Sequence, residues 1–209
     1  MATPLSGALL YGIVDLGYSE QTELVAVTRS LIEGGAGIIQ LRAKNCAKEN
    51  ILIWAQELAP VCKEAGVPFI VNDFIDIAVA VDADGVHLGQ DDGPLSAARE
   101  ALAEGKLVGR STHSPEQARA ALAEGADYIG FGPLFPTPTK VGRPGIGIEN
   151  VAQIQQEVGS QIPVFCIGGI KRENLPEVLG AGAQRIVIVS DLLLAPDIAG
   201  ATREVVSQL

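Results

Sequence analysis

An apolar segment followed by a segment with helical spacing recurs along the whole of this chain. The apolar segments are nearly continuous, as in the strands of a parallel sheet that is buried on both faces. The sequence predicts strands at residues 9–14, 37–41, 67–71, 85–88, 107–108, 128–131, 163–167 and 185–189. Eight such units favour a closed (β/α)8 barrel, because open doubly wound sheets, which share the alternation, usually have fewer strands.

No linker or break in composition divides the chain, so we predict one α/β domain, a (β/α)8 TIM barrel, over residues 1–209. Ser114, Pro115 and Gln117 have the spacing of an N-cap, a first-turn proline and a capping-box partner, which predicts the start of one helix. Pro60 is expected to kink or shorten the helix that contains Trp54.

Composition and charge narrow the classes of partner. A formal net charge of −10 repels polyanions, and an aromatic content of 4% offers few surfaces on which bases could stack, so we do not expect nucleic acid as a partner. No apolar run reaches the ~18 residues of a membrane span, and the first residues lack the basic start of an export signal. We therefore expect a cytoplasmic protein that does not bind membranes. The sequence leaves open whether the chain forms a homo-oligomer.

The three cysteines, Cys46, Cys62 and Cys166, are widely separated, with no pair at the spacing of metal ligands. This pattern favours buried, reduced thiols over a disulfide or a zinc site. We therefore do not expect redox chemistry.

Polar residues recur at or just beyond the carboxyl ends of the predicted strands. In a barrel these ends meet at one mouth, so their side chains should surround one site. The ring comprises Gln40, Arg42, Lys44, Asn72, Asp73, Asp91, Asp92, Ser111, Thr137, Thr139, Lys140, Gly169 and Ser190. A local basic pocket of this kind can hold a small phosphorylated ligand despite the acidic charge of the whole chain.

Residues 127–147 include a long loop rich in Gly, Pro and Thr. Compact domains seldom keep loops of this length unless the loop binds or covers something. Thr137, Thr139 and Lys140 supply two hydroxyls and an ammonium group, which suit an anionic ligand. The alternative is a solvated, proline-rich surface loop.

Two charged groups at the predicted mouth suggest specific chemistry. Arg42, Lys44 and Lys140 are cations able to hold a phosphate chain. Asp73 and Asp92 end neighbouring strands and form a plausible carboxylate pair for Mg²⁺, which keeps the rest of its shell as water and phosphate oxygen. Such a pair is also often merely solvated or paired with a cation. Whether Asp91 joins Asp92 at the metal stays open.

A second phosphate site is suggested after the last two strands. Gly168, Gly169 and Ser190 can present backbone N–H groups and a hydroxyl to a phosphate, although Gly-Gly after a strand is also a common tight turn. His87 lies between two apolar residues, so we interpret it as a buried structural residue rather than a catalyst. His113, next to a helix cap, is ambiguous.

Seven motifs carry a resemblance to a known family. They are QLRAK (40–44), ND (72–73), DGVHLGQDD (84–92), STHS (111–114), DYIGFGPLFPTPTK (127–140), IGGI (167–170) and VS (189–190). In these motifs, and in their order over nearly the entire length, the chain closely resembles the thiamine phosphate synthase family. That resemblance implies a (β/α)8 barrel that joins 4-amino-2-methyl-5-hydroxymethylpyrimidine diphosphate to 4-methyl-5-(2-hydroxyethyl)thiazole phosphate, forming thiamine phosphate and diphosphate with magnesium as cofactor.

The resemblance also implies roles for individual residues. The pyrimidine diphosphate would contact Gln40, Arg42, Lys44, Asn72, Ser111 and Lys140, the thiazole phosphate would contact Thr137, Thr139, Gly169, Val189 and Ser190, and Asp73 and Asp92 would hold Mg²⁺. The implied mechanism is dissociative, with Lys140, Arg42, Lys44 and Ser111 acting on the diphosphate as it departs and the thiazole nitrogen attacking a pyrimidine-stabilised carbocation.

Two residues depart from the family pattern. Ala43 stands where the family usually has Glu, and we expect little effect because Ala43 alternates away from Arg42 and Lys44. Arg110 replaces a small apolar residue, and it could place a charge inside the barrel.

Two alternative functions remain. One is the related thiazole tautomerase, whose members can carry a histidine where this chain has Pro133. The other is a non-catalytic phosphate-binding barrel.

Overall fold

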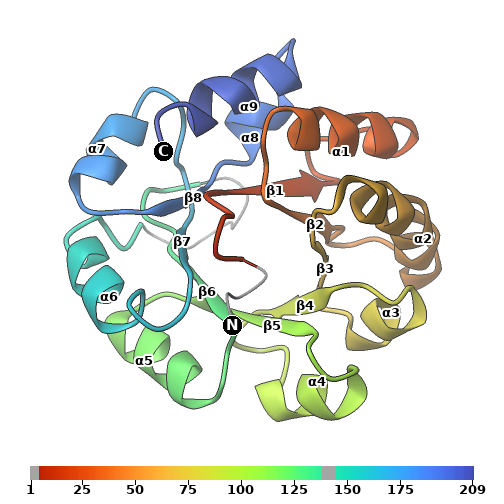
Figure 1. Ribbon diagram of the computed structural model, residues 1–209, viewed down its shortest axis with the longest axis horizontal. Coiled ribbons are helices and arrows are strands. Elements are labelled where there is room, and N and C mark those ends of the chain that lie inside the picture. Colours follow the sequence, from red (N-terminus) through yellow and green to blue (C-terminus); the bar gives the residue numbers. More distant parts are fainter. Residues whose placement is uncertain (1–4, 138–144) are drawn as a thin grey trace.

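The computed structural model describes residues 5–137 and 145–209, and within them eight parallel strands close into a barrel in the order β1 to β8. This confirms the predicted (β/α)8 fold. Figure 1 looks into the ring of strands, which the helices surround. The strands are β1 (Leu10–Asp15), β2 (Ile38–Arg42), β3 (Phe69–Asn72), β4 (Gly85–Leu88), β5 (Leu107–Thr112), β6 (Tyr128–Phe131), β7 (Val164–Cys166) and β8 (Arg185–Val187).

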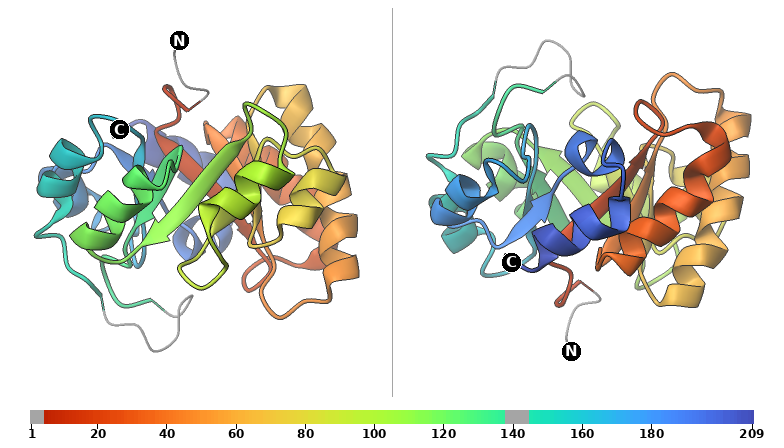
Figure 2. Two further views of the ribbon diagram at one scale, coloured as in Figure 1. Left: turned by 90° about the horizontal axis from the view of Figure 1, so that it is seen from below. Right: turned by 90° about the horizontal axis from the view of Figure 1, so that it is seen from above.

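Each strand leads through a loop to the helical layer outside the barrel, as the two side views in Figure 2 show. The helical elements are η1 (Gln21–Glu23), α1 (Leu24–Glu33), α2 (Lys48–Ala65), α3 (Ile75–Ala80), α4 (Leu95–Ala101), α5 (Pro115–Ala123), α6 (Val151–Glu157), α7 (Leu175–Gly180), α8 (Ser190–Leu193) and α9 (Ile198–Val206). None of the helices within the described ranges is long and apolar enough to cross a membrane.

The ends of two helices test the expectations from sequence. At α5, the Ser114 hydroxyl accepts a hydrogen bond from the Gln117 backbone N–H, as predicted for its N-cap. Pro60 does not shorten its helix, because α2 continues through Pro60 to Ala65, and a kink at Pro60 stays a prediction. Leu58 and Val61 are buried on either side of the proline, and this packing offsets the lost backbone hydrogen bond.

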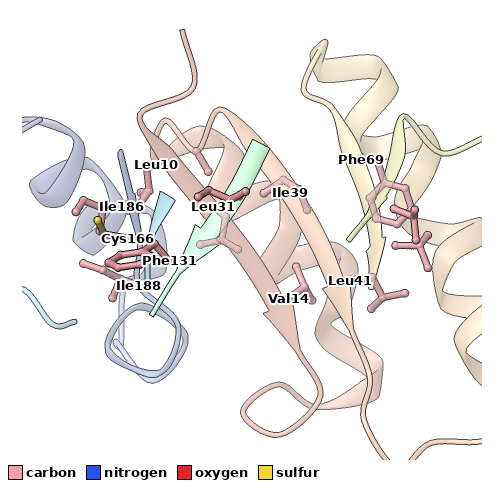
Figure 3. Packing of buried hydrophobic residues seen from close by; sticks show 14 of the residues in the cluster. Leu10, Val14, Leu31, Ile39, Leu41, Phe69, Phe131, Cys166, Ile186 and Ile188 are labelled. Atoms are coloured by element: carbon pink, nitrogen blue, oxygen red, sulfur yellow. The ribbon is translucent and has the colours of Figure 1, made fainter. Parts of the chain in front are cut away.

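The alternation of side chains along each strand divides the core in two. Outward-facing residues such as Val14, Ile39 and Leu41 pack against the helices (Figure 3). Inward-facing residues form a second cluster inside the barrel, which includes Tyr11 and Phe165. The same alternation directs the polar residues near the carboxyl ends of the strands either into the barrel or toward the helices.

Candidate active site

One cavity lies inside the barrel near the carboxyl ends of the strands. Its lining includes Gln40 and Arg42 from β2, Asn72 from β3, and Ser111 from β5. Residues separated by up to about seventy positions in sequence are therefore brought to one place, because all parallel strands of a barrel point the same way.

A buried ion pair holds Arg42 in this cavity. Asp15 ends β1 directly opposite Arg42 in the strand register, and its carboxylate lies 2.6 Å from the Arg42 guanidinium. The second carboxylate oxygen accepts the Gly17 backbone N–H at 2.9 Å. The sequence prediction ended the first strand at residue 14 and did not include Asp15 in the site. The available signal was its position at the same end of the barrel as Arg42.

Asp15→Asn is expected to lower the free energy of unfolding by about 1.5 to 3 kcal/mol, because the charge-assisted hydrogen bond to Arg42 is lost in a buried setting. Asn keeps the size of Asp and an oxygen for Gly17. Equilibrium urea denaturation measures the loss. Asp82→Asn is the matched control, because Asp82 pairs with Lys106 on the exposed surface and should change stability far less. Equal losses in the two variants would contradict the role given to Asp15.

Lys44, Asp73 and Asp92 meet at the rim of the same mouth. The Lys44 ammonium forms an ion pair with Asp73, and the Asp92 carboxylate accepts the Gly89 backbone N–H at 2.6 Å. Asp73 has a positive φ of 67°, and its N–H donates to the His87 carbonyl at 2.9 Å. A residue other than glycine held in this conformation is under local strain, which is common at functional sites.

The two carboxyls also influence each other's protonation. Burial raises the pKa of Asp73 and the neighbouring Asp92 carboxylate raises it further, while Lys44 acts in the opposite direction. Burial also acts to raise the pKa of Asp92, but hydrogen bonds from the Asp73 carboxyl and the Gly89 N–H lower it overall. One proton shared by the pair would relieve their repulsion, and a divalent cation could replace that proton.

The donor set fits Mg²⁺ on chemical grounds. Asp73 and Asp92 are hard oxygen ligands close enough to interact directly. Residues 5–137 and 145–209 contain no group of three or more His, Cys, Asp or Glu side chains that could hold a metal. Two carboxylates suit a magnesium ion that takes the rest of its ligands from water and substrate phosphate. Asp91 is exposed.

Arg110 does not enter the barrel interior, so that expectation from sequence is wrong. It alternates with the inward-facing Ser111 and turns outward, where its guanidinium donates to the carbonyls of Gly89 at 2.6 Å and Gly93 at 2.9 Å. A longer ion pair of 3.5 Å joins it to Glu124. Arg110 therefore ties together both ends of the short loop that carries Asp92. Ala43 also faces outward, buried in the layer between strands and helices, as expected.

A second cavity adjoins the first. Pro133, Thr137, Gly168, Gly169, Val189 and Ser190 help to line it. Ile167 and Val187 line both cavities, so the two share a wall. Thr137, Gly169, Val189 and Ser190 were assigned to one ligand from sequence, and the structure gathers them here. Thr139 and Lys140 lie outside the described residues.

The two glycines after β7 are required by close packing. Gly168 and Gly169 have positive φ values of 98° and 66°. A Cβ on Gly168 would lie 2.3 Å from the Pro133 Cα, and one on Gly169 would lie 2.7 Å from the Phe135 Cβ. The Phe135 N–H also donates to the Gly168 carbonyl at 2.9 Å. Glycine thus lets the loop after β6 lie directly on the loop after β7 beside the second cavity.

His87 is buried inside the barrel, as expected from sequence, but its ring contacts the site. Its Nε2 lies 3.0 Å from the Ser111 hydroxyl and its Nδ1 lies 3.3 Å from the Tyr128 hydroxyl. Sequence reasoning did not connect Tyr128 or Tyr11 to the site, because both lie within apolar strands. His113 bonds through Nδ1 to the Gly132 carbonyl beyond the end of β6.

A family model, relatives of known sequence and one solved structure point to the same family. The family model described as "Thiamine monophosphate synthase" matches residues 10–192. A thiamine-phosphate synthase of Halalkalibacterium halodurans is 45% identical over 202 residues, covering 96% of this chain and 94% of the relative. One from Synechocystis is 44% identical over 193 residues, covering 91% of this chain but 55% of the relative, so the chain spans about half of that protein. A solved thiamine phosphate pyrophosphorylase of Pyrococcus furiosus superposes with a TM-score of 0.84 at 38% identity, covering 95% of this chain and 93% of that one.

Proposed function

Because this chain belongs to the thiamine monophosphate synthase family, we propose that it is a thiamine-phosphate synthase, a transferase acting on small phosphorylated substrates. It joins 4-amino-2-methyl-5-hydroxymethylpyrimidine diphosphate to 4-methyl-5-(2-hydroxyethyl)thiazole phosphate and releases diphosphate. The three cysteines are free, which is compatible with a reducing cytoplasm as the place of reaction.

The observation that carries this proposal is the pair of adjoining cavities. A pyrimidine ring in the barrel cavity would lie beside Gln40 and Asn72, with its diphosphate toward Arg42 and Ser111 in the cavity and toward Lys44 at the rim. A thiazole phosphate in the second cavity would meet Gly169 and Ser190 across the shared wall. When both substrates are bound side by side, the translational and rotational entropy that they must lose to meet is already lost on binding, before the reaction begins.

The chemistry is a dissociative substitution. As the bond from the pyrimidine methylene carbon to the diphosphate oxygen breaks, negative charge grows on the diphosphate, and fixed cationic groups stabilise it. Arg42, Lys44 and Lys140 supply this charge. The positively charged pyrimidine fragment is then attacked by the thiazole nitrogen. No protein nucleophile is required.

Asp73 and Asp92 would hold Mg²⁺ at the diphosphate end of the site. The bound ion supplies further positive charge to the departing group. Lys44, which pairs with Asp73, would balance the carboxylate when the site carries no metal and turn toward the diphosphate when substrate is present.

The test supplies both substrates and magnesium to the purified chain. We expect release of diphosphate, followed in a coupled assay, together with thiamine phosphate detected by mass. Conversion of a thiazole precursor without diphosphate release would indicate the tautomerase instead. Binding of the thiazole phosphate with no product of either kind would indicate a non-catalytic barrel.

A further inference from the structure

A chain of hydrogen bonds crosses the interior of the barrel and ends at the substrate cavity. Gln40 Nε2 lies 2.7 Å from the Tyr11 hydroxyl, which lies 3.0 Å from the Tyr128 hydroxyl. Tyr128 lies 3.3 Å from His87 Nδ1, and His87 Nε2 lies 3.0 Å from the Ser111 hydroxyl. The five side chains come from five strands. Gln40 and Ser111, the first and last members of this hydrogen-bond chain, line the barrel cavity, and Tyr11 and His87 line it as well.

The direction of these bonds follows from counting donors. The amide nitrogen of Gln40 can only donate, so the Tyr11 oxygen accepts from it. Within residues 5–137 and 145–209 the other hydrogen-bonding partner of the Tyr11 hydroxyl is Tyr128, so the buried Tyr11 O–H finds its acceptor by donating to the Tyr128 oxygen. The Tyr128 O–H then donates to His87 Nδ1, which must therefore carry no hydrogen. The ring hydrogen of His87 is left on Nε2, where it donates to the Ser111 oxygen.

The surroundings of the two tyrosines keep this arrangement in place. Burial raises the pKa of Tyr11 and of Tyr128 well above the ordinary phenol value, so both remain O–H groups. Gly109 stands between His87 and Tyr128 in the strand register. A Cβ there would lie 2.5 Å from the Tyr128 oxygen and 2.6 Å from His87 Nδ1, so only glycine allows the two groups to meet.

We propose that the hydrogen bonds from Gln40 to Ser111 all run in one donor-to-acceptor direction, which the Gln40 amide sets. This direction, called the polarity below, fixes His87 as the neutral Nε2–H tautomer and leaves the Ser111 hydroxyl hydrogen directed at the substrate. Within residues 5–137 and 145–209, the Ser111 hydroxyl has one hydrogen-bonding partner, His87, which donates to it. Its own hydrogen is therefore available to a ligand. Tyr11, Tyr128 and His87 are positioning residues, because they act through Ser111.

The consequence for the reaction rests on the proposed function. Ser111 would donate to a diphosphate oxygen, and that hydrogen bond strengthens as negative charge grows on the departing group. With the opposite polarity, Ser111 would donate to His87 and would offer the diphosphate only lone pairs.

The direction of these hydrogen bonds can be tested without substrate. A negative result would therefore be distinguishable from failure of the proposed function. The sequence contains two histidines, so a two-bond ¹⁵N–¹H spectrum of protein labelled at histidine is simple to read. His113 is an internal reference, because its Nδ1 faces a carbonyl oxygen and must carry hydrogen. We expect His87 to show the opposite tautomer, with a bare Nδ1. A hydrogen on Nδ1 of His87 would overturn the proposal.

Gln40→Glu should reverse the donor-to-acceptor direction of these hydrogen bonds, because Glu has nearly the same shape as Gln but a different hydrogen-bonding capacity. A carboxylate can only accept, so Tyr11 would donate to residue 40, Tyr128 to Tyr11, and His87 Nδ1 to Tyr128. We expect Nδ1 of His87 to gain a hydrogen in this variant while His113 is unchanged. An unchanged His87 spectrum would show that Gln40 does not set the polarity.

The kinetics of Tyr128→Phe test whether the hydrogen-bond chain affects the reaction through Ser111. The variant keeps the aromatic packing but removes the hydroxyl that links Tyr11 to His87. We expect kcat to fall about tenfold, which is the effect of one misdirected hydrogen bond, while the KM of both substrates stays nearly unchanged. In a Ser111→Ala background the same change should have no further effect on kcat. An equal loss in both backgrounds would mean that Tyr128 acts independently of Ser111.

Discussion

Asp73→Asn is expected to lower the turnover of thiamine phosphate formation by about 10² to 10³, which corresponds to the roughly 3 to 4 kcal/mol lost when one charged contact to a transition state is removed. The substitution removes one of the two carboxylates proposed to hold Mg²⁺. It also leaves Lys44 without its anionic partner. Asn is the appropriate replacement because, among residues other than glycine, it tolerates the positive φ of 67° that Asp73 adopts.

Steady-state assays at several magnesium concentrations measure this effect. Loss of a metal ligand should raise the magnesium concentration needed for half-maximal rate, while thermal unfolding stays close to that of the parent. Asp82→Asn is the matched control, since Asp82 also has a positive φ, of 51°, and also pairs with a lysine, but it precedes the amino-terminal end of β4, away from the mouth. Near-normal turnover of the Asp73 variant, with an unchanged magnesium requirement, would refute the assignment.

Lys140→Ala is expected to lower turnover by a comparable factor of about 10² to 10³, for the same electrostatic reason. The ammonium group is proposed to stabilise charge that exists fully only after the diphosphate has left. The change should therefore lower kcat more than it raises the KM of the pyrimidine diphosphate.

Rapid-quench measurement of a single turnover separates this chemical step from product release. Lys63→Ala is a suitable control, because Lys63 lines a surface cavity at the amino-terminal ends of β3 and β4, away from the mouth. A Lys140 variant that turns over at a near-normal rate would remove Lys140 from the catalytic set. Partial recovery with Lys140→Arg would support a role for its charge.

The strand ends illustrate how far the sequence leads. Gln40, Arg42, Asn72 and Ser111 could be grouped at one mouth because each follows an apolar segment, and parallel strands align their ends. The ion pair between Asp15 and Arg42 could not be predicted in the same way. It depends on which residue of β1 lies opposite which residue of β2, and the register is set by closure of the barrel.

Arg110 shows the limit of reading one strand in isolation. The sequence predicted a strand of two residues, 107–108, whereas β5 continues to Thr112. With the strand so short, the alternation of side chains could not be extended to Arg110, and the sequence allowed a charge inside the barrel. Its contacts with the Gly89 and Gly93 carbonyls show the outward direction.

The sequence by itself determined the number and order of the strands and the end of the barrel where polar groups gather, because these follow from hydrophobic periodicity and the direction of the chain. Only the tertiary structure decided which of those groups touch. Tyr11, Tyr128 and His87 lie far apart in sequence, and they form one hydrogen-bonded chain because barrel closure aligns their strands and Gly109 leaves room between two of them. Contacts across strands depend on register and on the space left by neighbours, and neither is a property of a single segment.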